Sequence, residues 1–289
     1  MSSILITGAT GHLGNMIVEN LLNKFSSSDI SVLVRDEQKG EPFKAKGVNV
    51  KIGNYQDTAS LEQAMLGIDK VLLVSSSDFN DRLRQHKNVI DAAKKAGVKH
   101  ILYTGVTMKD IKNSPLKPLL EDHYQTEDYI KASGLTYTFL QNSLYFEVIP
   151  MFLGEKVLET GVFFPAGDGK VSFVFRKDLA EVTANILATE GHENKTYTLA
   201  STNVYSFAEV AAELSELSGT TVNYISPEAD AFEDMLKQIG LPDGIILMSV
   251  LFAAAIKNND FNITDNTVER LLGRKQTDLK TYIKGAFSL

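Results

Sequence analysis

The sequence predicts an α/β fold built on a doubly wound parallel sheet, and two observations lead to this prediction. In the first half, short runs of β-branched and aliphatic residues alternate with stretches whose apolar residues recur at helical spacing. Strands that alternate with helices form parallel sheets covered on both faces. The second half is less regular, which predicts a smaller, mainly helical C-terminal region that covers the substrate.

The expected elements follow from these runs in chain order. Strands are expected at residues 3–7, 30–34, 48–52, 70–74, 100–104 and 137–140, and later at 171–175 and 196–199. Helices are expected at residues 13–24, 60–66, 82–96, 123–133, 178–188, 206–218, 232–239 and 245–256. Gly97 and Gly134 supply stop signals, and Ser206 with Glu209 has the spacing of a capping box. We expect a first domain over residues 1–144 and a smaller region over 145–289, with residues 171–200 returning to the main sheet.

Composition excludes several classes of function. The 289 residues carry a net charge of −7 and no basic run, whereas non-specific nucleic-acid binding needs a clustered positive face. Cysteine is absent, which excludes disulfides, thiol nucleophiles and cysteine-held metals. The five histidines are scattered, so no metal site is expected. The longest apolar run, residues 245–256, is too short to span a membrane. We therefore expect a cytoplasmic monomer or homodimer that binds neither nucleic acid nor membrane.

A glycine-rich turn follows the first expected strand and opens the first expected helix. Gly8 permits a tight turn, Gly11 removes a Cβ where a pyrophosphate would approach, and Gly14 lets the helix pack closely on the strand. The helix N-terminus offers free N–H groups to phosphate. This pattern predicts a Rossmann-type dinucleotide site rather than a plain β–α turn. The other cofactor-binding residues expected in the turn are Thr10, His12 and Leu13.

The end of the second strand predicts which dinucleotide binds. Arg35 takes the first position after that strand, where an arginine accommodates the 2′-phosphate of NADP(H). Asp36 follows it, and an acidic residue here would instead suit the ribose of NAD(H). NADP(H) is therefore the favoured cofactor, with NAD(H) as the alternative.

The ends of the other strands supply further candidate residues for the cofactor. The loop after the third strand is also open to interpretation as an ordinary turn, and the loop after the fourth as a plain small-residue loop. The candidates are Asn54 and Tyr55 near the adenine, Ser75, Ser76 and Ser77 near the centre of the cofactor, and Thr104 and Gly105 near the nicotinamide.

Several segments resemble the short-chain dehydrogenase/reductase superfamily and, within it, the atypical NmrA-like branch. They are the glycine turn, the Val34-Arg35 strand end and residues 97–105, 123–128, 134–140 and 191–199. Within that branch the chain is most similar to triphenylmethane reductases and flavin-free NADPH:quinone oxidoreductases. The resemblance covers nearly the whole chain and implies an NADP(H)-dependent oxidoreductase that needs neither flavin nor metal.

The superfamily's usual Tyr-x-x-x-Lys pair is absent. None of the ten tyrosines has a lysine four residues later, and Tyr124 has Asp128 there, whose charge would raise the tyrosine pKa. A reductase needs no such pair if its acceptor is already electrophilic, because hydride then transfers directly. His123 matches a histidine common in the resembling subgroup, which implies that it positions the acceptor or contacts the ribose; it is otherwise a helix-start histidine.

The segment after the sixth strand is implied by the resemblance to lie against the nicotinamide amide. Asn142 fits the pattern of the related enzymes, whereas Gln141 replaces their arginine and puts a local salt bridge in doubt. Tyr145 is a candidate for positioning the substrate. The expected pocket lining is aromatic or apolar, with an ordinary core role as the alternative for its aromatic members. It comprises Phe79, Val106, Tyr145, Phe146 and Phe175.

Three functions therefore compete. The first is an NADPH-dependent reductase that transfers hydride directly to a quinone or a similar planar electrophile. The second is a catalytically silent NADP(H)-sensing regulatory protein, which the missing Tyr-x-x-x-Lys pair fits equally well. The third is a nucleotide-sugar epimerase-like enzyme, which the missing lysine opposes.

Overall fold

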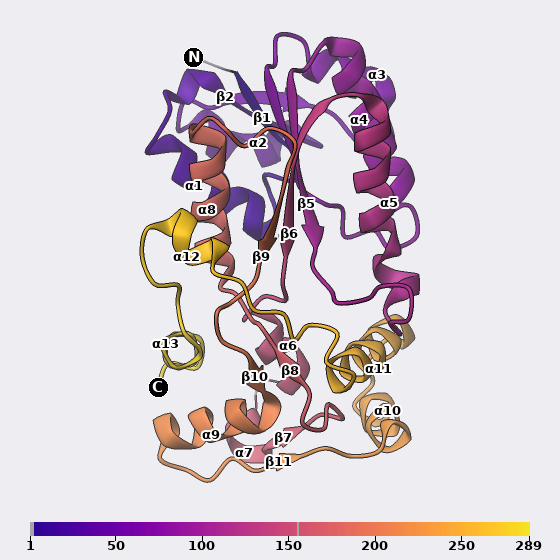
Figure 1. Ribbon diagram of the computed structural model, residues 1–289, viewed down its shortest axis with the longest axis vertical. Helices are drawn as coiled ribbons and strands as arrows, with labels where there is room; N and C mark the ends of the chain where they lie inside the picture. Colours follow the sequence, from indigo (N-terminus) through magenta and orange to yellow (C-terminus); the bar gives the residue numbers. More distant parts are fainter. Residues whose placement is uncertain (1–2, 155) are drawn as a thin grey trace. The chain divides into compact units, whose positions relative to one another are not determined.

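A computed structural model describes residues 3–154 and 156–289, and the chain divides into two compact units (Figure 1). The first unit comprises residues 1–106, 121–142 and 177–198, and the second comprises residues 107–120, 143–176 and 199–289. Sequence patterns did not predict that residues 107–120 belong to the second unit. Long-range hydrogen bonds place them there: the Lys109 N–H donates to the Asp260 carbonyl (2.9 Å), and the Ser114 hydroxyl donates to the Asp260 carboxylate (2.6 Å).

A seven-stranded sheet forms the first unit. Its strand order is β3-β2-β1-β4-β5-β6-β9. The strands are β1 (Ile4–Ile6), β2 (Ile30–Val34), β3 (Asn49–Ile52), β4 (Lys70–Leu73), β5 (His100–Val106), β6 (Thr136–Asn142) and β9 (Lys195–Leu199). The pairings among β1 to β6 are parallel. The strand order reverses between β1 and β4, so the predicted Rossmann-type, doubly wound α/β fold is confirmed.

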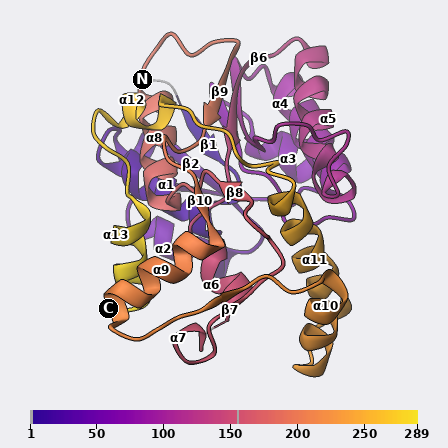
Figure 2. The same cartoon turned by 60° about the horizontal axis from the view of Figure 1, so that its bottom comes forward.

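Helices cover both faces of this sheet. On one face α3 (Thr58–Ala64), α4 (Arg82–Ala96) and α5 (Lys117–Ser133) pack over a core that includes Leu5, Val71 and Tyr103. Figures 1 and 2 both show α1 (His12–Leu22) and α8 (Arg176–Ala188) together on the other face. The short η1 (Ser27–Asp29) precedes β2, and α2 (Glu37–Lys44) follows it.

Helix ends follow local chemistry, which explains one difference from the expected boundaries. Gly97 and Gly134 have φ of 74° and 80°, the left-handed conformation that ends helices at glycine. The predicted capping box of Ser206 and Glu209 is present at the start of α9. Helix α5 begins at Lys117, six residues before the expected start, because Pro118 is tolerated in a first helical turn and interrupts no hydrogen bond there.

The second unit is mainly helical, with two small two-stranded pairings. Its elements are α6 (Val148–Leu153), α7 (Val157–Thr160), β7 (Val162–Phe163), β8 (Lys170–Val171), β10 (Tyr205–Ser206), α9 (Phe207–Ser218), β11 (Tyr224–Ile225), α10 (Ala229–Gln238), α11 (Asp243–Lys257), α12 (Thr267–Leu272) and α13 (Leu279–Ala286). The expected strand at 171–175 is thus reduced to β8 and an isolated bridge between Tyr145 and Val174.

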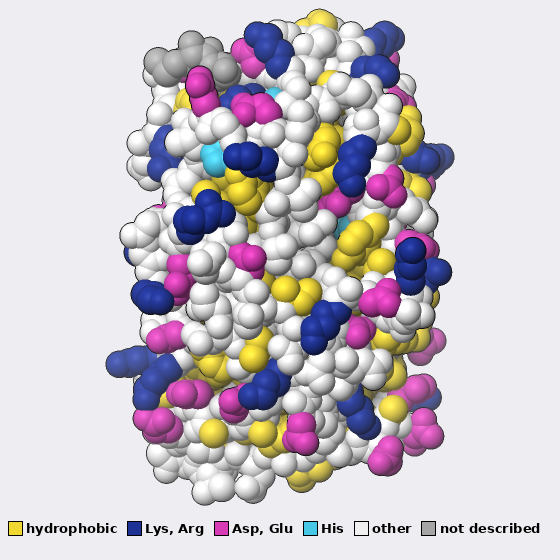
Figure 3. Space-filling model, viewed as in Figure 1, with side chains coloured by type: hydrophobic (Ala, Val, Ile, Leu, Met, Phe, Trp, Pro, Cys, Tyr) yellow, Lys and Arg dark blue, Asp and Glu magenta, His cyan; other side chains and the backbone are white. Residues whose placement is uncertain are grey.

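The surface carries both signs of charge. Figure 3 shows lysine and arginine side chains interspersed with acidic side chains on the face drawn. Within the described ranges, no helix combines the length and apolarity that a membrane crossing requires.

The closest helix–strand approach in the glycine turn gives a stability prediction. A Cβ built on Gly14 would lie 2.3 Å from the Gly8 carbonyl oxygen and 2.9 Å from the Ala9 Cα. Backbone must therefore move, so Gly14→Ala should lower the free energy of unfolding by about 3 kcal/mol, measured by urea denaturation. Gly244→Ala is the control, because a Cβ there meets nothing within 4 Å. Equal stability of the two variants would contradict the prediction.

Candidate functional site

The glycine turn forms a cradle at the carboxyl end of β1. Gly8 has φ of +60°, and a Cβ on it would lie 3.1 Å from the Val74 Cβ. Gly11 is exposed and serves as the N-cap of α1 without a side-chain hydrogen bond, and the first turn of α1 carries no acidic residue. The N–H groups of that turn are therefore available to an anion. Leu13 is buried, so only its backbone can contribute, whereas Thr10 and His12 are exposed.

Asp36, which left the choice of cofactor open, has a structural role. Its carboxylate accepts a hydrogen bond from the Lys39 backbone N–H (2.9 Å) and thereby caps α2, while the Lys39 ammonium lies 3.6 Å away. Arg35 is exposed and forms no hydrogen bond or ion pair with any residue that the structure describes. The guanidinium is therefore the charged group available at the end of β2.

Asn54 and Tyr55 are used locally. The Tyr55 hydroxyl donates to Thr7 Oγ1 (2.5 Å) and lies 3.2 Å from the Val74 carbonyl oxygen, so it braces the ends of β1 and β4. Burial raises the pKa of Tyr55, and the hydrogen bond to Thr7 opposes this rise. The Asn54 side chain accepts from the Gln56 N–H in an exposed turn. For the contact with adenine that the sequence predicts, the groups that remain are the Tyr55 ring and the exposed Asn54 amide.

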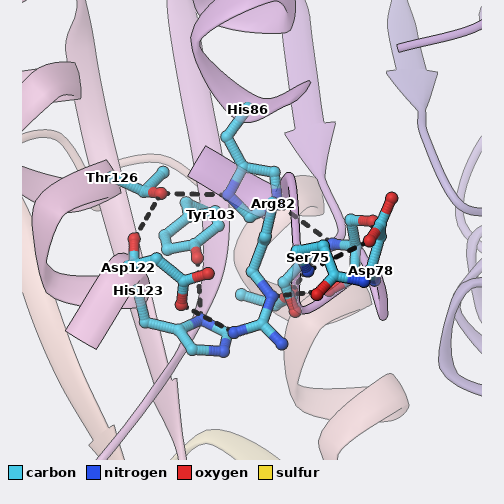
Figure 4. A network of polar contacts seen from close by, with 11 residues as sticks. Ser75, Asp78, Arg82, His86, Tyr103, Asp122, His123 and Thr126 are labelled. Carbon is cyan, nitrogen blue, oxygen red and sulfur yellow. Dashed lines mark hydrogen bonds and ion pairs between the residues drawn. The ribbon is translucent and has the colours of Figure 1, made fainter. Parts of the chain in front are cut away.

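Helix α4 holds the loop after β4 through Ser76. The Ser76 N–H donates to His86 Nε2 (3.0 Å), its carbonyl accepts from Arg82 Nε (2.8 Å), and its hydroxyl donates to Gln85 Oε1 (2.7 Å). We call this set of three contacts the Ser76 clamp, and Figure 4 shows two of the α4 residues that form it, Arg82 and His86. Next to it, the Ser75 N–H donates to Thr104 Oγ1 (2.9 Å), joining the ends of β4 and β5. The clamp fixes the backbone where the centre of a dinucleotide would pass.

The contacts of His86 define its tautomer. Because the Ser76 N–H donates to Nε2, that nitrogen carries no proton, and Nδ1–H faces Thr126 Oγ1 at 3.0 Å. Thr126 can accept this bond because its own proton goes to the Asp122 carbonyl (2.7 Å). Burial, and then the positive charge of Arg82, lower the pKa of His86 to about 3. His86 is therefore a neutral link between the β4 loop and α5.

Arg82 forms a buried ion pair with Asp122. The guanidinium is 3% exposed and lies 2.7 Å from the carboxylate, with its carbon 4.7 Å from the centre of the Phe79 ring. Burial raises the pKa of Asp122, and Arg82 opposes this rise. Phe79, expected in the pocket lining, is 44% exposed and accessible on this loop.

His123 lies beside Tyr103, a residue that the sequence did not single out. The Tyr103 hydroxyl and His123 Nδ1 are 2.7 Å apart, and both side chains are buried. Burial raises the pKa of Tyr103 well above its usual value, and burial followed by the charge of Arg82 lowers the pKa of His123 well below its usual value. Both groups are therefore neutral near pH 7.

Gly105 and Gln141 meet at a buried carboxylate on α5. Gln141 Nε2 donates to both oxygens of Glu127 at 3.0 Å, and a Cβ on Gly105 would lie 2.9 Å from Glu127 Oε1. Burial raises the pKa of Glu127, which the amide of Gln141 opposes. Gly105 thus has a packing role as well as its expected place beside a nicotinamide. Val106 and Asn142, at the ends of β5 and β6, are also buried.

The remaining candidates lie in the second unit. Arg176 lies over the Tyr145 ring at 4.7 Å and 3.6 Å from Glu147. Phe146 is fully buried and stacks on Tyr282 at 5.0 Å, so it belongs to the core of this unit rather than to a lining surface. Phe175 meets the edge of the same Tyr282 ring at 5.5 Å.

The structure brings most of the predicted cofactor residues to one edge of the first unit. Gly8, Arg35, Ser76, Thr104 and Asn142 each lie at or just beyond the carboxyl end of a strand of the same sheet. Sequence reasoning missed the residues that support them. Arg82, Gln85, His86, Asp122 and Tyr103 carry no motif, although the clustering of polar residues at the start of a helix after a strand end was a visible signal.

Among residues 3–154 and 156–289, no three or more histidine and acidic side chains are grouped so that they could hold a metal.

Comparisons with known proteins agree with this geometry. The profile of the NmrA-like family matches residues 1–285. The chain is 38% identical over 288 residues to quinone oxidoreductase 2 of Escherichia coli, covering 99% of both chains. It resembles the crystal structure of NADPH-dependent quinone oxidoreductase QOR2 from Escherichia coli complexed with NADPH (TM-score 0.93, 35% identity, 98% and 99% coverage). It also resembles Citrobacter sp. triphenylmethane reductase complexed with NADP(H) (TM-score 0.91, 36% identity, 98% and 100% coverage).

The His86 interactions predict a pH dependence of stability. Because its pKa is about 3 when folded and about 6.5 when unfolded, only the unfolded chain binds this proton between those values. The stabilisation is complete above pH 6.5 and is lost as the pH falls toward 3, by up to about 1.4 kcal/mol per pH unit. Urea denaturation from pH 7 to pH 4 should therefore show a shallower dependence for His86→Gln than for the unsubstituted protein.

Some dependence should persist in His86→Gln, because His100 and His123 also have lowered pKa values and act with the same sign. His12→Gln is the matched control, since His12 is exposed. The interpretation fails if His86→Gln and His12→Gln have the same slope.

Proposed function

Because the chain belongs to the NmrA-like family, we propose that it is an NADPH-dependent reductase that transfers hydride directly to a quinone or a similar planar electrophile. The observation that carries the proposal is the full-length similarity to quinone oxidoreductase 2, with 38% identity over 99% of both chains. The proposal is supported by the group of predicted cofactor residues at the carboxyl ends of the strands in the first unit.

The residues of this edge fit a dinucleotide. A Cβ on Gly8 would meet Val74 at 3.1 Å, so the turn stays open only with glycine. The uncapped N-terminus of α1 would hold the pyrophosphate, and Arg35 would hold a 2′-phosphate in fork geometry. The Ser76 clamp and Thr104 would hold the backbone along the ribose and nicotinamide. These contacts favour NADP(H) over NAD(H).

The chemistry requires little of the protein beyond binding and orientation. NADPH, when bound, supplies the hydride, and a quinone accepts it without prior activation. The reaction therefore needs neither a Tyr-x-x-x-Lys pair nor a flavin or metal. The chain's own contribution is to hold the two partners in contact, exclude water and offer a hydrogen-bond donor to the acceptor oxygen as it becomes negative. His123 is our candidate for that donor, and Tyr145 for a contact with the substrate ring.

The first experiment follows NADPH absorbance with purified, flavin-free protein and a panel of small quinones, with heat-denatured protein subtracted. We expect rapid NADPH loss and much slower NADH loss. Cofactor binding without turnover would overturn the reductase proposal and favour an NADP(H)-sensing protein. Binding of a nucleotide sugar would favour an epimerase-like enzyme.

Arg35 should control the preference for NADPH. Arg35→Ala should raise the KM for NADPH by about 10- to 100-fold and leave the KM for NADH nearly unchanged, because the charge-assisted bidentate pair is lost only for the phosphorylated cofactor. Initial rates with each cofactor measure this. Lys51→Ala, on β3, serves as a control for removal of a positive charge. Equal effects on both cofactors would contradict the assignment.

A further inference from the structure

The pairing of Tyr103 with His123 carries an inference about which imidazole nitrogen faces the substrate. Tyr103 lies on β5 and is completely buried, and His123 lies on α5 and is 7% exposed. Their side chains meet through the phenol hydroxyl and Nδ1, 2.7 Å apart. Both residues belong to the first unit, and Figure 4 shows them beside Arg82 and His86.

The direction of this hydrogen bond follows from acid–base chemistry. A phenol is a better donor than the N–H of a neutral imidazole, and an unprotonated imidazole nitrogen is a better acceptor than a phenol oxygen. The stronger bond therefore has the Tyr103 hydroxyl donating to Nδ1. A neutral imidazole carries one proton, so the proton of His123 is then on Nε2.

The Nε2 edge of His123 is open. Nε2 forms no hydrogen bond with any described residue, and it is not among the fully enclosed polar atoms that lack a partner. The side chain of His123 as a whole is 7% exposed. The ring lies beside Arg82, which bonds to the Ser76 carbonyl in the loop after β4. Ligands of doubly wound sheets bind beyond the carboxyl ends of the strands, where such loops lie. Nε2–H is thus a free donor at the candidate site.

We propose that Tyr103 is a positioning residue that holds His123 as the Nε2–H tautomer, so that Nε2–H donates a hydrogen bond to the acceptor oxygen that becomes negative during reduction. The inference rests on the proposed function. The C–H bond of the reduced nicotinamide breaks, the acceptor gains the hydride and becomes an oxyanion, and water later protonates that oxyanion. His123 keeps its proton throughout, so the step needs no further acid.

Buried positive charge supports a neutral donor at this position. Burial, and then the positive charge of Arg82, lower the pKa of His123 well below its usual value, so the ring carries a single proton near pH 7. A neutral N–H still stabilises a developing oxyanion when it is held in place before the reaction. Tyr103 provides that orientation, as second partners of catalytic histidines generally do.

Two substitutions at His123 distinguish the role of Nδ1 from the role of Nε2. The amide of asparagine reaches the place of Nδ1 and can still accept from Tyr103, whereas the longer glutamine places its NH₂ near Nε2. We expect His123→Asn to lower kcat for quinone reduction by about 100-fold and His123→Gln by about 10-fold or less. A purely structural role, in which His123 only satisfies Tyr103, predicts the opposite order. Thermal unfolding checks that both variants fold.

Tyr103→Phe tests the positioning role. We expect kcat to fall about fivefold with little change in the KM for NADPH, because one hydrogen bond that fixes the tautomer is lost. The independent readout is the ¹⁵N chemical shift of the imidazole nitrogens in uniformly labelled protein. His123 should be an Nε2–H tautomer in the unsubstituted protein and a mixture in Tyr103→Phe, while His86 remains Nδ1–H as an internal reference.

The outcomes are distinguishable. An Nδ1–H tautomer in the unsubstituted protein, or His123→Asn as active as His123→Gln, would overturn the inference and leave the reductase proposal intact. Absence of turnover in the unsubstituted protein would overturn both, and the ¹⁵N result would then describe only a buried hydrogen bond. Turnover with the expected order of variants and the expected tautomers would support both.

Discussion

The three hydrogen bonds that α4 makes to Ser76 fix the loop after β4 against the start of that helix. They satisfy both backbone groups and the hydroxyl of one loop residue from a single rigid helix. Backbone polar groups that are shielded from water need partners, and for Ser76 these three partners come from within ten residues along the chain. Ser76 is therefore held by nearby sequence. The groups that hold Arg82 and His86 in turn lie forty residues further along, on α5.

That long-range support explains which parts of the structure could be predicted. The β-branched runs, Gly97 and the Ser206–Glu209 pair are local signals, and they located strands, a helix end and a capping box correctly. The early start of α5 and the transfer of residues 107–120 to the second unit depend on partners distant in sequence, such as Asp260. Periodicity carries no information about such partners.

The candidate site also contains residues that the sequence could predict and residues that only tertiary contacts reveal. The positions of the glycine turn and Arg35 follow from strand ends alone, because the carboxyl ends of parallel strands meet at one edge. Tyr103 reads as an ordinary core residue of a buried strand, and only its distance to His123 reveals a polar partner. Phe146 shows the reverse case, since an aromatic residue near a strand end was expected to line a pocket and instead packs against Tyr282. A sequence pattern places an aromatic residue on an element, but it does not predict whether the ring lines a pocket or packs in the core.

The role of Asp36 as the cap of α2 limits how the chain could acquire a different cofactor preference. The Asp36 carboxylate accepts the Lys39 N–H, and a rotation of the side chain toward a ribose that broke this bond would leave α2 without its cap. An acidic group at position 35, which is exposed and caps no helix, would leave this cap in place. On the proposed role of Arg35, cofactor choice and helix initiation fall to adjacent residues, so that one can be changed by substitution without the other.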